Sequence, residues 1–232
     1  MMIDFSSVGV IILAAMIHAT LQLAVGALLL LYHESLGKHI RIKTKYLVSN
    51  YITGSGILIG LMLAAICFGI VSLWGRSLPL EGLAVLTGIM VALAICVWFF
   101  YYRTGRSTEL WLPKVVTRYI NRRAKVTESN TEAFALGLLA SLAEMPFSLV
   151  LMIVAANSIL SLPQIQQVAA VTVYVLVAML PQMFLRFFIR HGRTVADVQK
   201  WRVNNKNFFR FLSGAGFMIL AGFLVAFKIM GS

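Results

Sequence analysis

The residue of this chain with the clearest chemical meaning is Glu144, which lies in the middle of a long apolar segment. A carboxylate at membrane depth is costly, and such groups usually mark a path for protons, ions or substrate. Pro146 removes a backbone donor and clashes with the preceding turn, so we expect it to be a hinge that opens the helix locally. Ser141, on the same segment, is a further candidate for contact with substrate or proton.

A second polar group lies in the apolar segment Val8–Tyr32, where His18 and Gln22 are four residues apart and share one helix face. His18 is near the middle of its segment, as Glu144 is of its own. If the two segments meet at this depth, the imidazole and the carboxylate would form a pair that titrates as a unit. Such pairs serve as proton relays or cation sites in carriers. In the alternative, His18 hydrogen-bonds to Gln22 or to a backbone carbonyl, and Glu144 is protonated and structural.

Pro181 and Gln182 form a third polar position, towards the end of another apolar segment. A proline can kink a membrane helix and free the carbonyls of the preceding turn. We therefore expect a second hinge at Pro181, with Gln182 lining a vestibule that opens to the cytoplasm. Equally, both residues would fit a helix end near the membrane surface.

These residues belong to a chain with the composition of an integral membrane protein. Its 232 residues are 60% hydrophobic and 12% charged, whereas soluble domains are about 45–50% apolar and about 25% charged. Crossing a bilayer takes about 20 apolar residues in a helix, and long continuous runs indicate helices rather than barrel strands. Six segments have this length: Val8–Tyr32, Tyr51–Trp74, Leu80–Tyr102, Ala133–Leu160, Ile165–Phe188 and Phe208–Ile229.

Basic residues are concentrated in alternate connections between these six segments. All but two of the 20 Lys and Arg residues lie in or beside the first, third and fifth connections, the exceptions being Arg76 and Lys228. Because cytoplasmic loops are rich in Lys and Arg, we expect these connections in the cytoplasm and both termini outside. The net charge of +12 then favours anionic lipid of the inner leaflet as a partner, and not nucleic acid. The expected location is a cell membrane, the inner membrane if the source is bacterial.

The third connection divides this single membrane domain into two halves. Residues 1–102 form the first three-helix half, 103–132 a basic linker, and 133–232 the second half. Three helices per half give the halves opposite orientations. Transporters with inverted repeats share this plan and place their site near the midplane between the repeats.

The linker itself contains an amphipathic pattern beginning near Leu112. We expect a short cytoplasmic helix on the inner leaflet, with its apolar face down and its cations towards anionic headgroups. An ordinary solvated linker helix is the alternative. The candidate lipid-contacting residues are Lys114, Arg118, Arg122 and Arg123.

Two runs of small residues, Thr53-Gly54-Ser55-Gly56 and Ser213-Gly214-Ala215-Gly216, open the second and sixth segments. Small residues allow helices to approach closely in lipid, where packing drives association. We therefore expect tight helix contacts at both runs. The alternative is a substrate path lined by backbone.

Polar turns in the first helix of each half, His18-Ala19-Thr20-Leu21-Gln22 and Ala143-Glu144-Met145-Pro146, accompany six helices and a basic central loop. This arrangement resembles the LysE-type superfamily of six-helix carriers. The resemblance implies transport of an amino acid, a metal ion or thiol redox equivalents. The redox branch has a reactive Cys in helices one and four, whereas Cys67 and Cys96 lie in the second and third segments, which argues against electron transfer. The metal-exporting branches look richer in intramembrane Asp and Asn than this chain, which argues against a metal substrate.

The sequence favours a small secondary transporter that exports a solute or cation. Glu144 and His18 would couple transport to protons, with Gln22, Ser141 and Gln182 contacting substrate. No cofactor is expected, since the segments lack a central Lys, a second His at depth and hydrolase motifs, and the residues do not identify a metal. One alternative is a non-transport membrane subunit or lipid-handling protein; a weaker one is a membrane enzyme using the same pair. A homo- or hetero-oligomer fits each of these.

Overall fold

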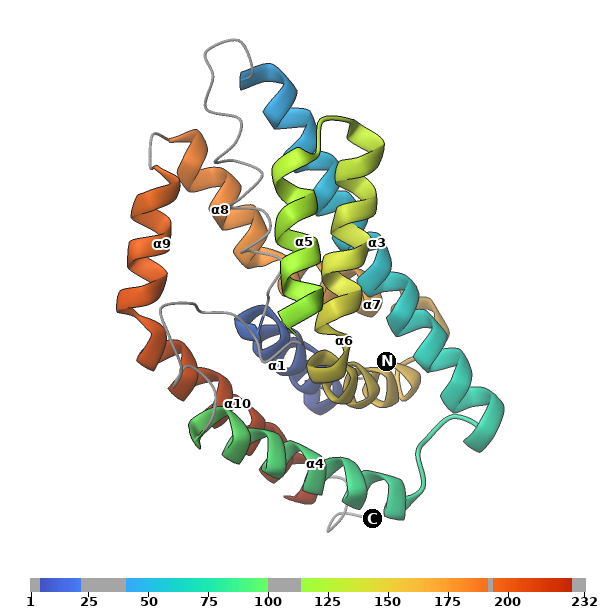
Figure 1. Cartoon of the computed structure of the whole chain (residues 1–232). Helices are drawn as coiled ribbons and strands as arrows, with labels where there is room; N and C mark the ends of the chain where they lie inside the picture. Colours follow the sequence, from blue (N-terminus) through green and yellow to red (C-terminus); the bar gives the residue numbers. More distant parts are fainter. Residues whose placement is uncertain (1–4, 22–40, 100–113, 192–193, 227–232) are drawn as a thin grey trace.

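The computed structural model describes residues 5–21, 41–99, 114–191 and 194–226, which are helical apart from short turns and contain no strand (Figure 1). This confirms the all-helical fold class. The helices are α1 (Phe5–Leu21), α3 (Arg41–Trp74), α4 (Leu80–Phe99), α5 (Lys114–Val126), α6 (Asn130–Leu160), α7 (Gln164–Ala178), α8 (Leu180–Arg190), α9 (Val195–Asn204) and α10 (Lys206–Leu224).

Four helices are long and apolar enough to cross a membrane: α3 from Tyr46 to Trp74, α4, α6 and α10. Together, α7 and α8 make a fifth candidate that is bent by 48°. Helix α1 is apolar but shorter than a full span, and residues 22–32 of the expected first segment lie outside the described part. The described residues thus contain four or five of the six expected spans.

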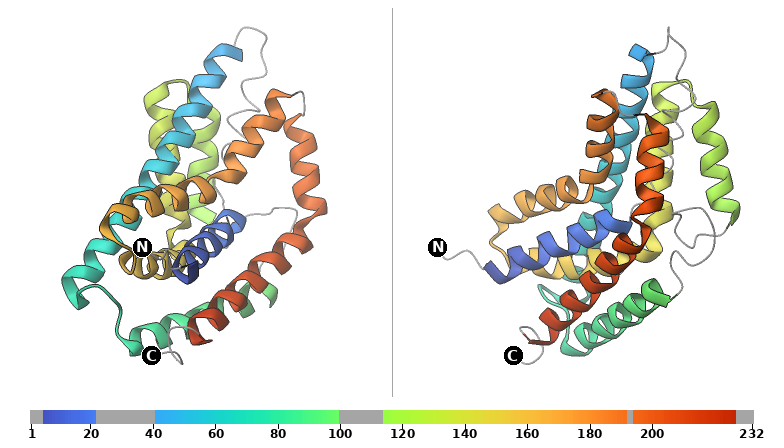
Figure 2. Two further views of the ribbon diagram at one scale, coloured as in Figure 1. Left: turned by 180° about the vertical axis from the view of Figure 1, so that it is seen from behind. Right: turned by 90° about the vertical axis from the view of Figure 1, so that its left-hand side faces the viewer.

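Helix α6 lies at the centre of the fold. It begins with a capping box, in which the Ser129 hydroxyl accepts from the Glu132 amide at 3.1 Å and the Glu132 carboxylate accepts from the Ser129 amide. Half of its most apolar stretch is buried, against 17% for α3. Figures 1 and 2 show that α6 descends beside α5 and then turns in its middle. The helix contains Pro146, which cannot donate to the carbonyl four residues earlier.

Close helix packing occurs at both runs of small residues. A side chain on Gly137 of α6 would collide with the Tyr51 carbonyl of α3, and one on Gly54 would collide with the Phe134 carbonyl. These two glycines let the α3 and α6 backbones approach each other directly. In α10, a side chain on Gly214 would collide with the Trp98 indole of α4. The two glycine contacts between α3 and α6 fix how far along each other these two helices lie.

The break between α7 and α8 falls at Met179, just before the predicted hinge. Pro181 lies in the first turn of α8, where its missing amide donor costs little. Gln182, the next residue, is fully buried, and α8 contacts both α1 and α3.

The amphipathic helix expected in the linker is α5, which packs along the first part of α6. Ile120 and Ala124 are buried, whereas Arg118, Arg122 and Arg123 are exposed. The Arg123 guanidinium lies 5.8 Å from the centroid of the Tyr119 ring. The buried part of the apolar face is thus covered by protein, while contact of the three exposed arginines with lipid stays a prediction. The side chain of Lys114 lies outside the described part.

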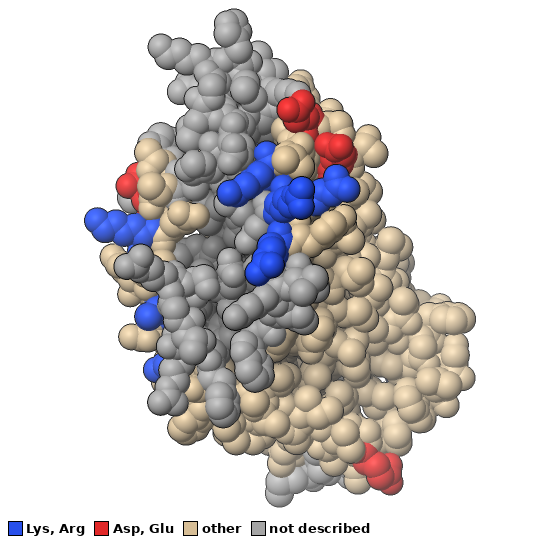
Figure 3. Space-filling model, viewed as in Figure 1, with Lys and Arg blue, Asp and Glu red and all other residues tan. Residues whose placement is uncertain are grey.

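The outward faces of the long helices are strongly apolar. Phe68 is 74% exposed, Ile165 83% and Val168 74%. Such extensive apolar exposure is unusual for a soluble monomer and typical of a surface covered by lipid or protein. In Figure 3, Lys and Arg gather around α5, and the described surface at the lower right of this face is almost free of charge.

Candidate functional site

Glu144 lies in the α3–α6 interface and is only 2% exposed. Its carboxylate interacts electrostatically with the Tyr51 hydroxyl of α3, and Tyr51 is itself fully buried. Ser55, one turn further along α3, reaches the same hydroxyl and donates to the Gly137 carbonyl at 3.1 Å. We call Tyr51, Ser55, Gly137 and Glu144 the Glu144 cluster. It lies where the two helix backbones approach most directly.

His18 lies in a second polar contact, between α1 and α7. Its Nδ1 atom is 3.0 Å from the Tyr174 hydroxyl, and the two ring centroids are 5.8 Å apart. His18 is 1% exposed and Tyr174 is fully buried. Either group can donate in this hydrogen bond, depending on the imidazole tautomer. We call these two residues the His18 pair.

The structure therefore gives His18 and Glu144 different neighbours. Each lies against a tyrosine from another helix, although α1 and α6 do pack together. Coupling between the imidazole and the carboxylate stays a prediction, and the hydrogen bond of His18 agrees with a structural role for that residue. The sequence reading missed Tyr51 and Tyr174. Both tyrosines lie in apolar helices. A buried tyrosine hydroxyl usually has a hydrogen-bond partner, so each tyrosine could have been recognised as a candidate partner for a buried polar residue.

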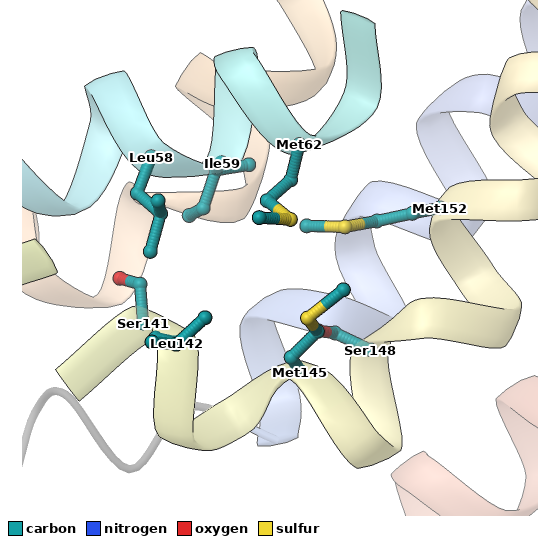
Figure 4. A pocket seen from close by; sticks show the side chains of 8 residues that line it. All are labelled: Leu58, Ile59, Met62, Ser141, Leu142, Met145, Ser148 and Met152. Carbon is teal, nitrogen blue, oxygen red and sulfur yellow. The ribbon is translucent and has the colours of Figure 1, made fainter. Parts of the chain in front are cut away.

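A small pocket opens along the same α3–α6 interface (Figure 4). Ser141 lines it, is 8% exposed, and has no hydrogen-bond partner for its hydroxyl. Ser148, almost two turns further on, donates to the Glu144 carbonyl at 3.2 Å. The complete lining is Leu58, Ile59, Met62, Ser141, Leu142, Met145, Ser148 and Met152.

The remaining predicted site residues are dispersed. Gln182 lies at the start of α8, and Gln22 lies outside the described part. In the described ranges, no group of three or more His, Cys, Asp and Glu residues is placed to hold a metal ion. Comparisons with protein-family models, curated proteins and solved structures gave no match. The geometry of the α3–α6 interface is thus the basis for a functional interpretation.

Proposed function

We propose that this protein is a small secondary transporter that couples movement of a small solute or cation to protons through Glu144. The observation that carries the proposal is a carboxylate, 2% exposed, in the interface of two membrane-length helices and beside a pocket. A charged residue in such a position is costly and is retained mainly where it binds a proton, an ion or a substrate.

The packing of the helices supports an inverted repeat. If α1, α3 and α4 correspond to α6, α7–α8 and α10, then α1 packs on its counterpart α6, and α4 on its counterpart α10. The α3–α6 contact corresponds to the α7–α1 contact. The polar contacts agree with this correspondence of helices. Glu144 of α6 interacts with Tyr51 of α3, and His18 of α1 contacts Tyr174 of α7. Sites between such repeats are common in carriers.

In this proposal the chain has six spans, with α1 in the first of them. The basic connections face the cytoplasm and both termini lie outside, as the positive-inside rule requires. Pro146 and the α7–α8 break would be the flexible points at which one side of the site opens while the other closes, because irregular backbone in a membrane is tolerated where it lines a cavity.

The Glu144 carboxyl would hold a proton in one state and release it when a cation or cationic substrate arrives. Because the cation replaces the proton, the buried site stays close to neutral. This avoids the cost of an uncompensated charge in an apolar interface. The Tyr51 hydroxyl, which hydrogen-bonds with Ser55, would orient the carboxylate during this exchange.

The test is proton movement in proteoliposomes carrying a pH-sensitive dye, challenged with a panel of metal ions and amino acids. A solute that moves protons through the wild type should do so at least about tenfold more slowly through Glu144→Gln, because the variant cannot exchange a proton. Glu81→Gln is the matched control, since Glu81 lies exposed in the first turn of α4. Equal rates for wild type and Glu144→Gln would contradict the proposal.

A further inference from the structure

Three methionines line the pocket beside the Glu144 cluster. Met62 comes from α3, and Met145 and Met152 come from α6, two turns apart. Figure 4 shows the thioether ends of Met62 and Met152 pointing towards each other, with Met145 extending into the same space. Thus three of the eight lining residues end in sulfur donors from two facing helices.

Thioether sulfur is a soft, neutral donor. Soft ligands of this kind select Cu(I), whereas Mg²⁺ and Ca²⁺ require carboxylate, carbonyl or water oxygens. The rest of the lining is mainly apolar and is formed by Leu58, Ile59 and Leu142, which lie towards the Ser141 side in Figure 4. Such walls exclude water, which favours a weakly hydrated monovalent ion over a strongly hydrated divalent one.

The end of the pocket away from the methionines contains one polar group. The Ser141 hydroxyl is buried, has no hydrogen-bond partner and points towards α3 in Figure 4. A buried hydroxyl without a partner is destabilising, so this space differs from an ordinary apolar packing gap. Methionine also fills gaps in cores, but a gap filler has no need of a polar neighbour.

Neutral thioethers cannot balance the charge of a bound cation. In a low-dielectric interface that charge needs a nearby anion, and Glu144 directly precedes Met145 in α6 and lies in the same α3–α6 interface. We propose that this pocket binds a soft monovalent metal ion, Cu(I) by its chemistry, with Met62, Met145 and Met152 as ligands and Glu144 as the compensating charge. The ion stays monovalent while it is bound, and no electron is transferred. This inference rests on the proposed function, because it names the substrate class of the same transporter.

Silver(I) is a suitable probe, because it is soft and monovalent like Cu(I) and is not readily oxidised or reduced in buffer. The purified full chain in detergent is titrated with silver nitrate without chloride. Both cysteines are first replaced, Cys67→Ala and Cys96→Ala, because free thiols bind silver themselves. We expect one tightly bound silver ion per chain, measured by elemental analysis after desalting and by competition with a chelator.

The ligand variants are Met62→Leu, Met145→Leu and Met152→Leu, singly and together. Leucine has nearly the volume of methionine, so folding is retained. Changes in groups that merely support metal ligands lower affinity by roughly 10–100-fold, so each single ligand variant should weaken silver binding at least tenfold, and the triple variant should abolish it. Met90→Leu is the matched control, because Met90 is fully buried in α4 and outside the pocket. It should bind silver as the parent does.

Two outcomes overturn the inference: no stoichiometric silver binding by the parent protein, or undiminished binding by the folded triple variant. The proposed function fails separately. If silver does not bind but another solute drives proton movement that depends on Glu144, transport stands and the metal inference falls. If silver binds through the three methionines but no metal or other solute moves protons, the site stands and transport falls.

Discussion

The Glu144 cluster and the His18 pair each join two helices through a buried tyrosine, but their surroundings differ. Glu144 interacts with the Tyr51 hydroxyl, which Ser55 also reaches, and its neighbour Met145 lines a pocket. His18 meets one tyrosine, and the next polar residue of α1, Thr20, is tied to α10 by the Ser213 hydroxyl at 2.9 Å. A pocket lies in the same helix interface as Glu144, whereas His18 lies among contacts that join α1 to α7 and α10. We therefore propose Glu144 rather than His18 as the site of proton exchange.

The largest expected effect is on stability, at the close backbone contact between α3 and α6 in the Glu144 cluster. In Gly137→Ala the new methyl group meets the Tyr51 carbonyl, and neither backbone can yield easily. We expect a loss of about 3 kcal/mol in the free energy of unfolding, the upper part of the range for overpacking. The comparison variant is Gly88→Ala in α4, where nothing lies within 4 Å, and it should gain about 0.5–1 kcal/mol.

Chemical unfolding in detergent, followed by circular dichroism, measures both variants. If Gly137→Ala is as stable as Gly88→Ala, the close approach of α3 and α6 does not hold the Glu144 cluster in place, and its contrast with the His18 pair loses its structural basis.

The second prediction compares the two tyrosines. Tyr51→Phe removes the hydroxyl that interacts electrostatically with the Glu144 carboxylate and hydrogen-bonds with Ser55. A carboxylate in an apolar interface depends on its few polar neighbours. The Glu144-dependent proton movement should therefore slow by at least about tenfold. Tyr174→Phe removes the partner of His18 and should lower the free energy of unfolding by about 1–3 kcal/mol, with little change in proton movement per folded protein.

The rate of proton movement, measured with the dye, and the free energy of unfolding are determined for both variants. Together they distinguish a loss of function from a loss of stability. A slower flux in Tyr174→Phe, equal to that in Tyr51→Phe, would show that the two contacts act as one relay. It would favour the originally expected coupling of His18 to Glu144.

The sequence was most informative about features that depend on a residue and its chain neighbours. Apolar length predicted the helices, the small residues predicted close helix packing at Gly54, and the position of Glu144 beside Pro146 identified the buried acid and the bent helix. The tyrosine partners were not predictable in this way. Spacing along a helix fixes which residues share a face, but only packing decides which helix that face meets.

At α5 and at the α7–α8 break, the sequence likewise predicted the kind of feature but not its surroundings or exact position. The amphipathic pattern of α5 located an apolar face correctly, yet Ile120 is covered by α6, and a pattern alone does not distinguish lipid from protein. At Pro181 the sequence predicted a kink, and the break falls at Met179. Proline is well suited to a first helical turn, so the helix restarts just before it.

The smallest effect is expected from Ser213→Ala, which tests the joining role assigned to the His18 side. The Ser213 hydroxyl is fully buried and donates to the Thr20 hydroxyl at 2.9 Å or to the Phe209 carbonyl at 2.8 Å. Because Phe209 keeps its helical hydrogen bonding, only one interhelical bond is lost, worth about 0.5–1.5 kcal/mol. The free energy of unfolding should fall by that amount, while silver binding and proton movement stay unchanged. A tenfold loss of either activity with a small loss of stability would mean that the α1–α10 contact takes part in function, and that the two regions differ less than their surroundings indicate.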